Sequence, residues 1–202
     1  MVRPTAQKDK PTARKNRAAD IQTAAIKVFS EKGYSAASLQ DLAEEVGLLK
    51  GSLYYYIDSK ESILFEIFEN SNDAVVEIMR LTDAQNLEPR DRLLEYTRQL
   101  TYWYLEHRDR ASLYFTEWRY LTGEYSDIVR EQRRQFISYV RQIIAEAQAR
   151  GLTAPDVDVN ISSVFIMSAV NSVPIWYQSS GPITRDEIAE RTAELATRAV
   201  FG

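Results

Sequence analysis

The sequence contains no cysteine, and glycine and proline are scarce, with seven and six among 202 residues. Without cysteine the chain has no disulfide, no thiolate zinc site and no cysteine nucleophile. A reducing cytoplasm is the compartment that suits such a chain. An all-β fold needs turn residues roughly every 8–12 positions, and so few glycines and prolines cannot supply them. These absences favour an all-helical fold.

Histidine occurs once, as His107, which limits the enzymatic chemistry open to the chain. One histidine cannot form a histidine-based metal cluster, and a catalytic triad would depend on this residue alone. Its predicted place near a helix C-terminus, where a cation is stabilised, accounts for it. No GxSxG nucleophile motif and no P-loop occurs. We therefore predict no enzyme, no metal and no cofactor, and keep a helical adaptor that binds only proteins as the alternative class.

Long hydrophobic runs are almost absent. The most apolar stretch, Ile161 to Tyr177, lacks charges but contains Asn171 and Pro174. Its 17 residues are marginal for crossing a bilayer. The start of the chain, residues 1–17, is basic and polar without an apolar core, unlike a secretory signal. We expect residues 161–177 to form a buried central helix of a cytoplasmic protein without membrane association.

Charge is distributed unevenly along the chain. The net charge is −4, yet residues 1–60 carry 10 Lys/Arg and 7 Asp/Glu, a balance of +3, which leaves −7 for the remainder. Residues 1–15 are basic and lack apolar periodicity, so we predict a disordered basic arm. A basic front on an acidic body indicates that only the front meets an anionic partner such as DNA.

Apolar residues recur at three- to four-residue spacing through most of the chain, which predicts about nine helices and no strand. We divide the chain into the arm (1–15), a three-helix DNA-binding domain (16–62) and a helical ligand-binding and dimerisation domain (63–202). The expected helices run over about 17–32, 38–46, 51–57, 59–82, 89–103, 111–121, 125–150, 161–177 and 184–199.

Two short helices joined by a tight turn predict a helix-turn-helix. Ser38 followed by Asp41 is typical of a capping-box start, and Gly47 ends the first helix. Only the three residues 48–50 separate it from the next helix. Leu53 and Ile57 lie on one face of that second helix and should pack it against the first.

The opposite face of that second helix carries polar groups suited to DNA. Ser52, Tyr55 and Tyr56 lie together on it because residues three and four apart are helical neighbours. Three consecutive tyrosines, 54–56, cannot all enter one buried stripe. Tyrosine hydroxyls donate to phosphates, and the rings pack on thymine methyl groups. Gly51 has no side chain, which allows a close approach of DNA to the backbone.

The stretches FSEKGY, SLQDLA and GSLYYYIDSKE (residues 29–34, 38–43 and 51–61) resemble the DNA-binding domain of TetR-family repressors. The resemblance implies a homodimer on a palindromic double-stranded operator, with a small-molecule effector site in each C-terminal body. Ile57 stands where phenylalanine is usual, which should alter only packing. Family residues that touch phosphates match Ser38, Ser52, Tyr54, Tyr56 and Lys60, and those that face bases match Gln40, Lys50 and Tyr55.

The C-terminal body is rich in aromatic residues, which line ligand cavities between helices but equally form plain core. Asn171, inside the apolar helix, needs a hydrogen-bond partner, either a ligand or a neighbouring helix. Pro174 should kink that helix. The predicted ligand-binding residues are Trp103, Tyr104, Trp118, Arg119, Arg134, Phe165, Asn171, Trp176 and Tyr177.

The identity of the effector is indicated only by short patterns. Arg119, Arg130, Arg133 and Arg134 suit carboxylate or phosphate recognition, with a salt-bridged solvent face as the alternative. Trp176-Tyr177 followed by residues 181–184 is similar to TetR-family regulators of lipid and sterol degradation that sense acyl-CoA esters. That resemblance implies that the arginines meet the CoA phosphates; the alternative effector is a multidrug-like hydrophobic compound. Small residues in the last two helices predict a four-helix dimer interface.

Overall fold

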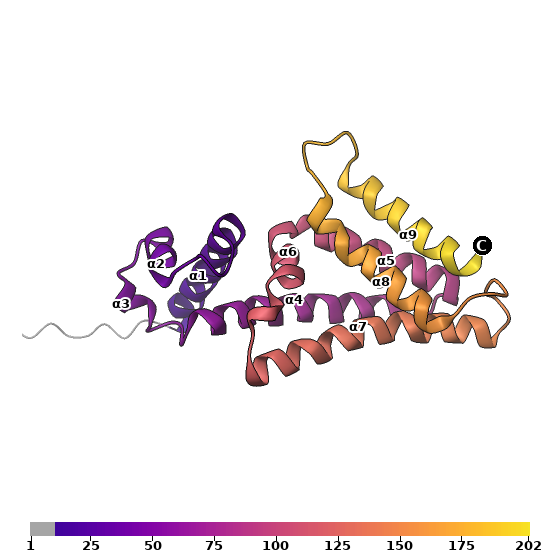
Figure 1. Cartoon of the computed structure of the whole chain (residues 1–202), viewed down its shortest axis with the longest axis horizontal. Coiled ribbons are helices and arrows are strands. Elements are labelled where there is room, and N and C mark those ends of the chain that lie inside the picture. Colours follow the sequence, from indigo (N-terminus) through magenta and orange to yellow (C-terminus); the bar gives the residue numbers. More distant parts are fainter. Residues whose placement is uncertain (1–10) are drawn as a thin grey trace, which may run out of the picture. The chain divides into compact units, whose positions relative to one another are not determined.

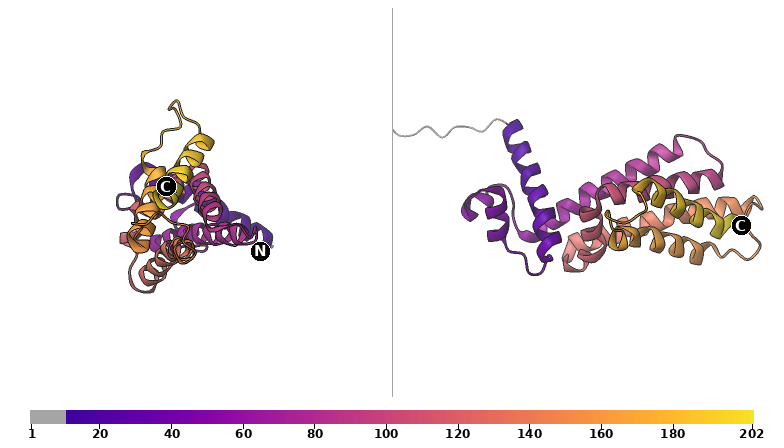
Figure 2. Two further views of the ribbon diagram at one scale, coloured as in Figure 1. Left: turned by 90° about the vertical axis from the view of Figure 1, so that its right-hand side faces the viewer. Right: turned by 90° about the horizontal axis from the view of Figure 1, so that it is seen from above.

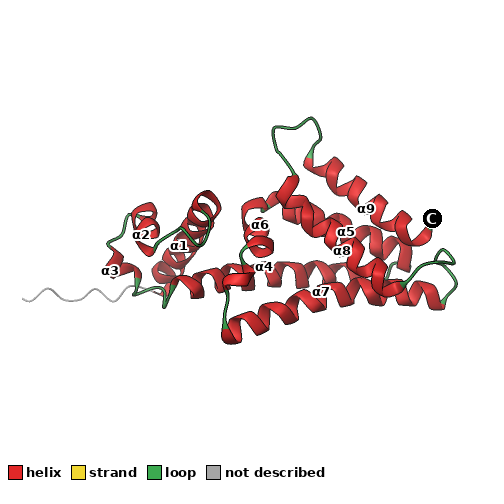
Figure 3. Ribbon diagram, in the orientation of Figure 1, coloured by secondary structure: helices red, strands yellow, loops and turns green. Residues whose placement is uncertain are grey.

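The computed structural model describes residues 11–202, with side chains from residue 16 onward. It divides into two compact units, Met1–Ile67 and Phe68–Gly202, a few residues beyond the predicted division after residue 62. The described chain is helical without a strand (Figures 1 and 3), which confirms the predicted all-α class. The helices are α1 (Pro11–Lys32), α2 (Leu39–Val46), α3 (Lys50–Leu53), α4 (Lys60–Asp83), α5 (Pro89–Glu106), α6 (Arg108–Thr116), α7 (Gly123–Ala149), α8 (Val159–Trp176) and α9 (Arg185–Phe201), with a 3-10 turn η1 (Trp118–Tyr120).

The first helix begins earlier than the sequence pattern indicated. α1 starts at Pro11 rather than Arg17, so residues 11–15 of the predicted arm are helical. Proline suits the first helical position because its missing N–H would have no partner there. Residues 1–10 of that arm lie outside the described residues.

The core of the first unit forms where the apolar faces of α1, α2 and α3 pack together. Phe29 of α1 is buried with its ring 5.1 Å from that of Tyr34, edge to face. Leu42 of α2 and Leu53 of α3 are fully buried. α3 is only four residues long, and Ile57 continues it as a turn by donating its N–H to Leu53 O at 3.2 Å. This short core fixes which side of α3 faces outward.

The second unit is a bundle built around α5. Helix α9 lies alongside α5, and α8 packs on α5, α6 and α7 (Figure 2). The buried face of α5 includes Leu93, Tyr96 and Leu100, each without solvent exposure. Arg108 donates from Nε to Pro174 O at 3.1 Å, which satisfies a carbonyl near the end of α8.

Helix α8 corrects the expectation of a buried central helix. Ile166, Met167 and Val170 are buried, but Phe165 is 64 % exposed and Ile161 is exposed on the same outer side. Within the described chain α8 is the one helix long and apolar enough to cross a membrane, a property that core helices share. Leu195 of α9 is likewise 64 % exposed. The apolar pattern was correct for both helices, but one side of each is not covered by its own chain.

Candidate nucleic-acid interface and internal cavity

The polar side of α3 and the turn after it faces outward. Leu53 and Ile57 are buried, as the spacing predicted, and they hold this segment to the rest of the unit. Tyr54 and Tyr55 are 52 % and 62 % exposed. Lys50, Gly51 and Ser52 are also exposed, and Tyr56 is half-buried. Hydroxyl, phenol and ammonium groups therefore lie together on one exposed face over an apolar base.

The start of α2 is fixed by a capping box. Ser38 Oγ accepts from the Asp41 N–H at 3.1 Å, and Asp41 Oδ2 accepts from the Ser38 N–H at 2.8 Å. Lys32 Nζ lies 2.6 Å from Asp41 Oδ1. Hydrogen bonds from Lys32 and Ser38 hold the pKa of Asp41 well below its usual range. Ser38 thus first positions α2, and its contact with a phosphate stays a prediction.

Lys60 is held close to the same face. Its Nζ lies 4.2 Å from the centre of the Tyr34 ring and 3.5 Å from Ser35 O. Partial burial lowers the pKa of Lys60. Ser59 precedes it and bonds reciprocally with Ser62, with Ser62 N 2.9 Å from Ser59 Oγ and Ser59 N 3.0 Å from Ser62 Oγ. The start of α4 is therefore rigidly capped beside the predicted phosphate contact.

Lys50 differs from the other described cations of this unit. Lys27 pairs with Glu45 at 2.7 Å, and Arg17 donates to Val46 O at 3.3 Å. Among the side chains described from residue 16 to residue 67, Lys50 is the basic one without an ion pair or hydrogen bond in the chain. Its charge is available to an external anion.

Gly51 and Gln40 complete the predicted set. A Cβ built on Gly51 would meet no described atom within 4 Å, so no contact in residues 16–202 requires glycine there. Gln40 on α2 is exposed and donates from Nε2 to Glu44 Oε1 at 2.8 Å. The structure therefore brings the sequence-predicted DNA residues to the surface of one unit.

The second unit contains a small internal cavity of about 10 Å³, room for a single water molecule. Of the predicted ligand-binding residues, Trp103 and Tyr104 line it. Tyr104 donates its hydroxyl to Asn171 Oδ1 at 3.3 Å, which gives the asparagine the partner that the sequence required. Burial raises the pKa of Tyr104. The complete lining is Ser71, Val75, Trp103, Tyr104, Ala111, Tyr114 and Phe136.

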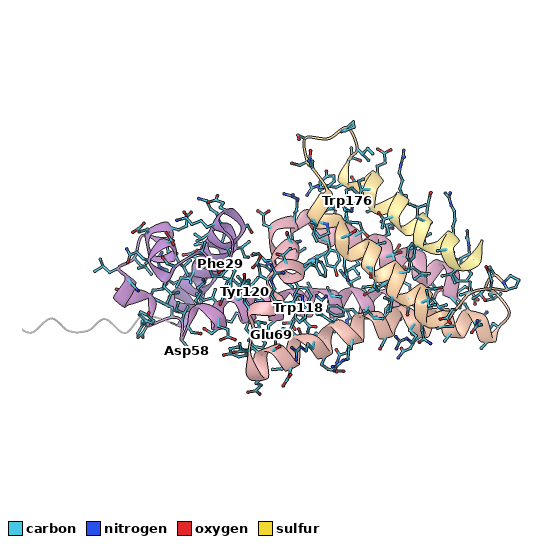
Figure 4. The ribbon with its side chains drawn as sticks, viewed as in Figure 1. Phe29, Asp58, Glu69, Trp118, Tyr120 and Trp176 are labelled. Carbon is cyan, nitrogen blue, oxygen red and sulfur yellow. The ribbon has the colours of Figure 1, made fainter. Side chains whose placement is uncertain are left out.

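The other predicted ligand residues lie elsewhere. Arg134 pairs with Glu131 at 2.7 Å on the surface, and Arg119 is exposed. Phe165 and Trp176 lie on the exposed side of α8, where Figure 4 marks Trp176. The ring of Trp118 lies beside the guanidinium group of Arg133. Tyr177 packs in a cluster with Leu105, Val173 and Ile188.

Sequence reasoning missed Tyr114 and Phe136 as cavity residues. Phe136 was part of the apolar stripe of α7, and Tyr114 of the aromatic stretch before Gly123. Periodicity marks such residues as inward but cannot separate core from cavity lining.

Two family models match the chain. The model described as bacterial regulatory proteins of the tetR family matches residues 21–67, and that described as the tetracyclin repressor-like C-terminal domain matches residues 86–200. The second match alone spans more than half of the chain.

Individual relatives agree with these matches. The chain is 26 % identical over 185 residues to the HTH-type transcriptional repressor KstR2 of Rhodococcus jostii, covering 91 % of this chain and 90 % of that protein. The structure of the ketosteroid transcriptional regulator KstR2 of Mycobacterium tuberculosis has a TM-score of 0.85 at 21 % identity. The match covers 99 % of this chain and 100 % of that one. The structure of AibR in complex with isovaleryl coenzyme A and operator DNA has a TM-score of 0.80 at 23 % identity. The match covers 89 % of this chain and 97 % of that one. The chain belongs to the TetR family of helix-turn-helix transcriptional repressors.

Proposed function

We propose that the chain is a cytoplasmic homodimeric repressor that reads a palindromic operator and releases it when a small effector binds the second unit. The DNA-binding part of this proposal rests on the exposed face of residues 50–56, which lies over the buried side chains of Leu53 and Ile57. A recognition helix must bury one side and offer the other to the major groove. Lys50, unpaired in the described chain, is ready for a phosphate or a base edge.

The second copy is proposed to cover the outer side of α8 and α9. Phe165, Trp176 and Leu195 are exposed there, and a groove of about 360 Å³ runs between the two helices beside Ala169 and Ala196. An exposed apolar surface of this kind marks an interaction site. Two helices from each of two copies make a four-helix bundle. Such a dimer presents two reading faces, for half-sites roughly 34–36 Å apart.

The effector is proposed to act through α4, which contributes residues to both units. Lys60 begins this helix in the first unit, and Ser71 and Val75 line the cavity in the second. The volume of the cavity is sufficient for about one water molecule, so an effector can enter only when the cavity opens. An effector that binds the open arrangement better than the closed one shifts the population of dimers away from operator spacing.

An acyl-CoA is the effector class that we favour. AibR, a structural neighbour, was solved with isovaleryl coenzyme A and operator DNA. The Trp176-Tyr177 pattern of this chain is similar to acyl-CoA-sensing regulators, although Trp176 itself lies on the outer side of α8. A multidrug-like hydrophobic compound is the alternative, for which the apolar cavity walls are equally suited.

The test begins with selection of bound DNA from a random pool, followed by titration of the selected operator. Lys50→Met should weaken binding and lower the slope of log affinity against log salt by about 1.8, as expected for two lost phosphate contacts, one from each copy of the dimer. Arg130→Met removes one charge from the second unit and should leave that slope unchanged. Isovaleryl-CoA should release the operator. Equal operator affinity with and without acyl-CoA and hydrophobic drugs would contradict the switch.

A further inference from the structure

Arg133 is the one arginine near the start of α7 that turns inward. Arg130 and Arg134 pair with acids on their own helix, Asp127 at 3.6 Å and Glu131 at 2.7 Å. The guanidinium carbon of Arg133 instead lies 5.0 Å from the ring centre of Trp118. The rings of Tyr114 and Phe115 lie 5.8 and 5.9 Å from it. Aromatic rings therefore surround this cation on several sides.

No carboxylate of the described chain pairs with Arg133. Its Nη1 is buried and has no hydrogen-bond partner among the residues that the structure describes. Leaving a buried donor of a charged group unpaired is costly, because the group has lost water without gaining a protein partner. Ring contacts offset only part of that cost. The position is energetically suited to an external oxygen that accepts a hydrogen bond.

Two other residues near Arg133 also have a buried polar atom without a hydrogen-bond partner in the described structure. Tyr114 is 4 % exposed and Gln132 is 7 % exposed, and within the described part of the chain both Tyr114 Oη and Gln132 Oε1 lack a hydrogen-bond partner. Gln132 Nε2 donates to Glu69, which Figure 4 marks together with Trp118. Burial raises the pKa of Tyr114, so its hydroxyl remains a proton donor at neutral pH.

The same tyrosine connects these polar atoms to the cavity. Tyr114 lines the cavity, whose other walls include the apolar side chains of Val75, Ala111 and Phe136. A few convergent polar groups beside an apolar space is the usual composition of a small-molecule site. Buried donors without partners call for a specific explanation, and an accepting oxygen of a ligand head group supplies one for Arg133 Nη1 and Tyr114 Oη.

We propose that Arg133 and the Tyr114 hydroxyl bind the head-group oxygen of an acyl effector, a carboxylate or a thioester carbonyl, while its apolar chain enters the cavity. This inference rests on the proposed effector-binding function and specifies its chemistry. Both groups donate hydrogen bonds, and one is cationic, so the site selects an acyl oxygen and repels hydrophobic cations. The free acid and the CoA thioester share this chemistry.

The test measures binding of octanoate, octanoyl-CoA and octan-1-ol to the full-length protein by tryptophan fluorescence. The wild type should bind octanoate or octanoyl-CoA more tightly than octan-1-ol, and whichever acyl form binds identifies the source. Arg133→Met should weaken acyl binding by about tenfold or more, the loss expected for a charge-assisted hydrogen bond. The matched control Arg80→Met, at an exposed arginine that pairs with Glu77 on its own helix, should bind as wild type does. Absence of acyl binding to the wild type, or wild-type affinity in Arg133→Met, would overturn the proposal.

Two further readouts separate ligand binding from structure and from DNA binding. Arg133→Met should melt at or above the wild-type temperature, since it removes an unpaired buried donor; a fall of several degrees would mark Arg133 as a packing residue and overturn the proposal. Without ligand, Arg133→Met should bind the selected operator like the wild type. If the wild type binds no DNA but acyl binding behaves as expected, the proposed repressor function fails while the acyl site stands.

Discussion

Gly51 is a residue whose small size no neighbour in the described structure explains. It lies within α3 on the outward face, and an added methyl group would meet no atom within 4 Å. Gly51→Ala should keep or raise thermal stability, because alanine favours a helix over glycine by up to about 1 kcal/mol. Operator affinity should fall by roughly tenfold, about 1.4 kcal/mol, if DNA approaches the backbone here. Melting curves and operator titrations check both; undiminished affinity would show that the methyl group meets no DNA.

Individual residues also show where sequence reasoning ends. The outward face of residues 50–56 follows from helical spacing, which is local and readable. The pairing of Lys27 with Glu45, which leaves Lys50 as the unpaired cation, depends on how α1 and α2 meet. The arginines are harder still: Arg133 and Arg134 are adjacent, and about 100° of helical rotation separates an inward cation from a surface one. The spacing could not decide between them without the helix phase.

At the scale of an element, the capping box of α2 makes the helix sensitive to acid. An unfolded aspartate has a pKa of about 3.9, and Lys32 and Ser38 hold that of Asp41 below this. Its stabilisation is therefore full above about pH 4 and is lost as the pH falls further. Asp41→Asn should reduce the hydrogen-exchange protection of α2 at neutral pH, and its difference from wild type should shrink at about pH 3. An equally large difference at both pH values would show that Asp41 does not stabilise α2 by its charge.

The ends and faces of helices were predicted unequally well. Gly47 adopts the left-handed conformation at the end of α2, as predicted, and Gly33 does the same at the end of α1. The start of α1 at Pro11 was missed because the polar residues 11–15 carry no apolar period. In α8, composition predicted burial, but it cannot tell whether the covering surface belongs to the same chain.

At the scale of the whole molecule, the exposed apolar side of α8 and α9 predicts self-association. Leu195→Glu should yield a monomer in light scattering at micromolar concentration, with unchanged helicity, because Leu195 is already 64 % exposed. Operator affinity should fall strongly, since one copy reaches only one half-site. Leu152→Glu, an exposed leucine outside both helices, is the matched control and should leave the oligomeric state unchanged. A wild type that is monomeric under these conditions would refute the dimer.

The closed cavity has a consequence for how sensitive this regulator is to its signal. When the competent state is a small fraction of the population, the measured dissociation constant is the intrinsic one divided by that fraction. For the proposed effector, the concentration that releases the operator is then set by the packing of Tyr114 and Phe136 as much as by contacts with the effector. Trimming the Phe136 ring, which has no part in the proposed head-group contacts, would favour the open state. A change in a residue that touches no head group could thus retune the detection threshold without altering which compound is detected.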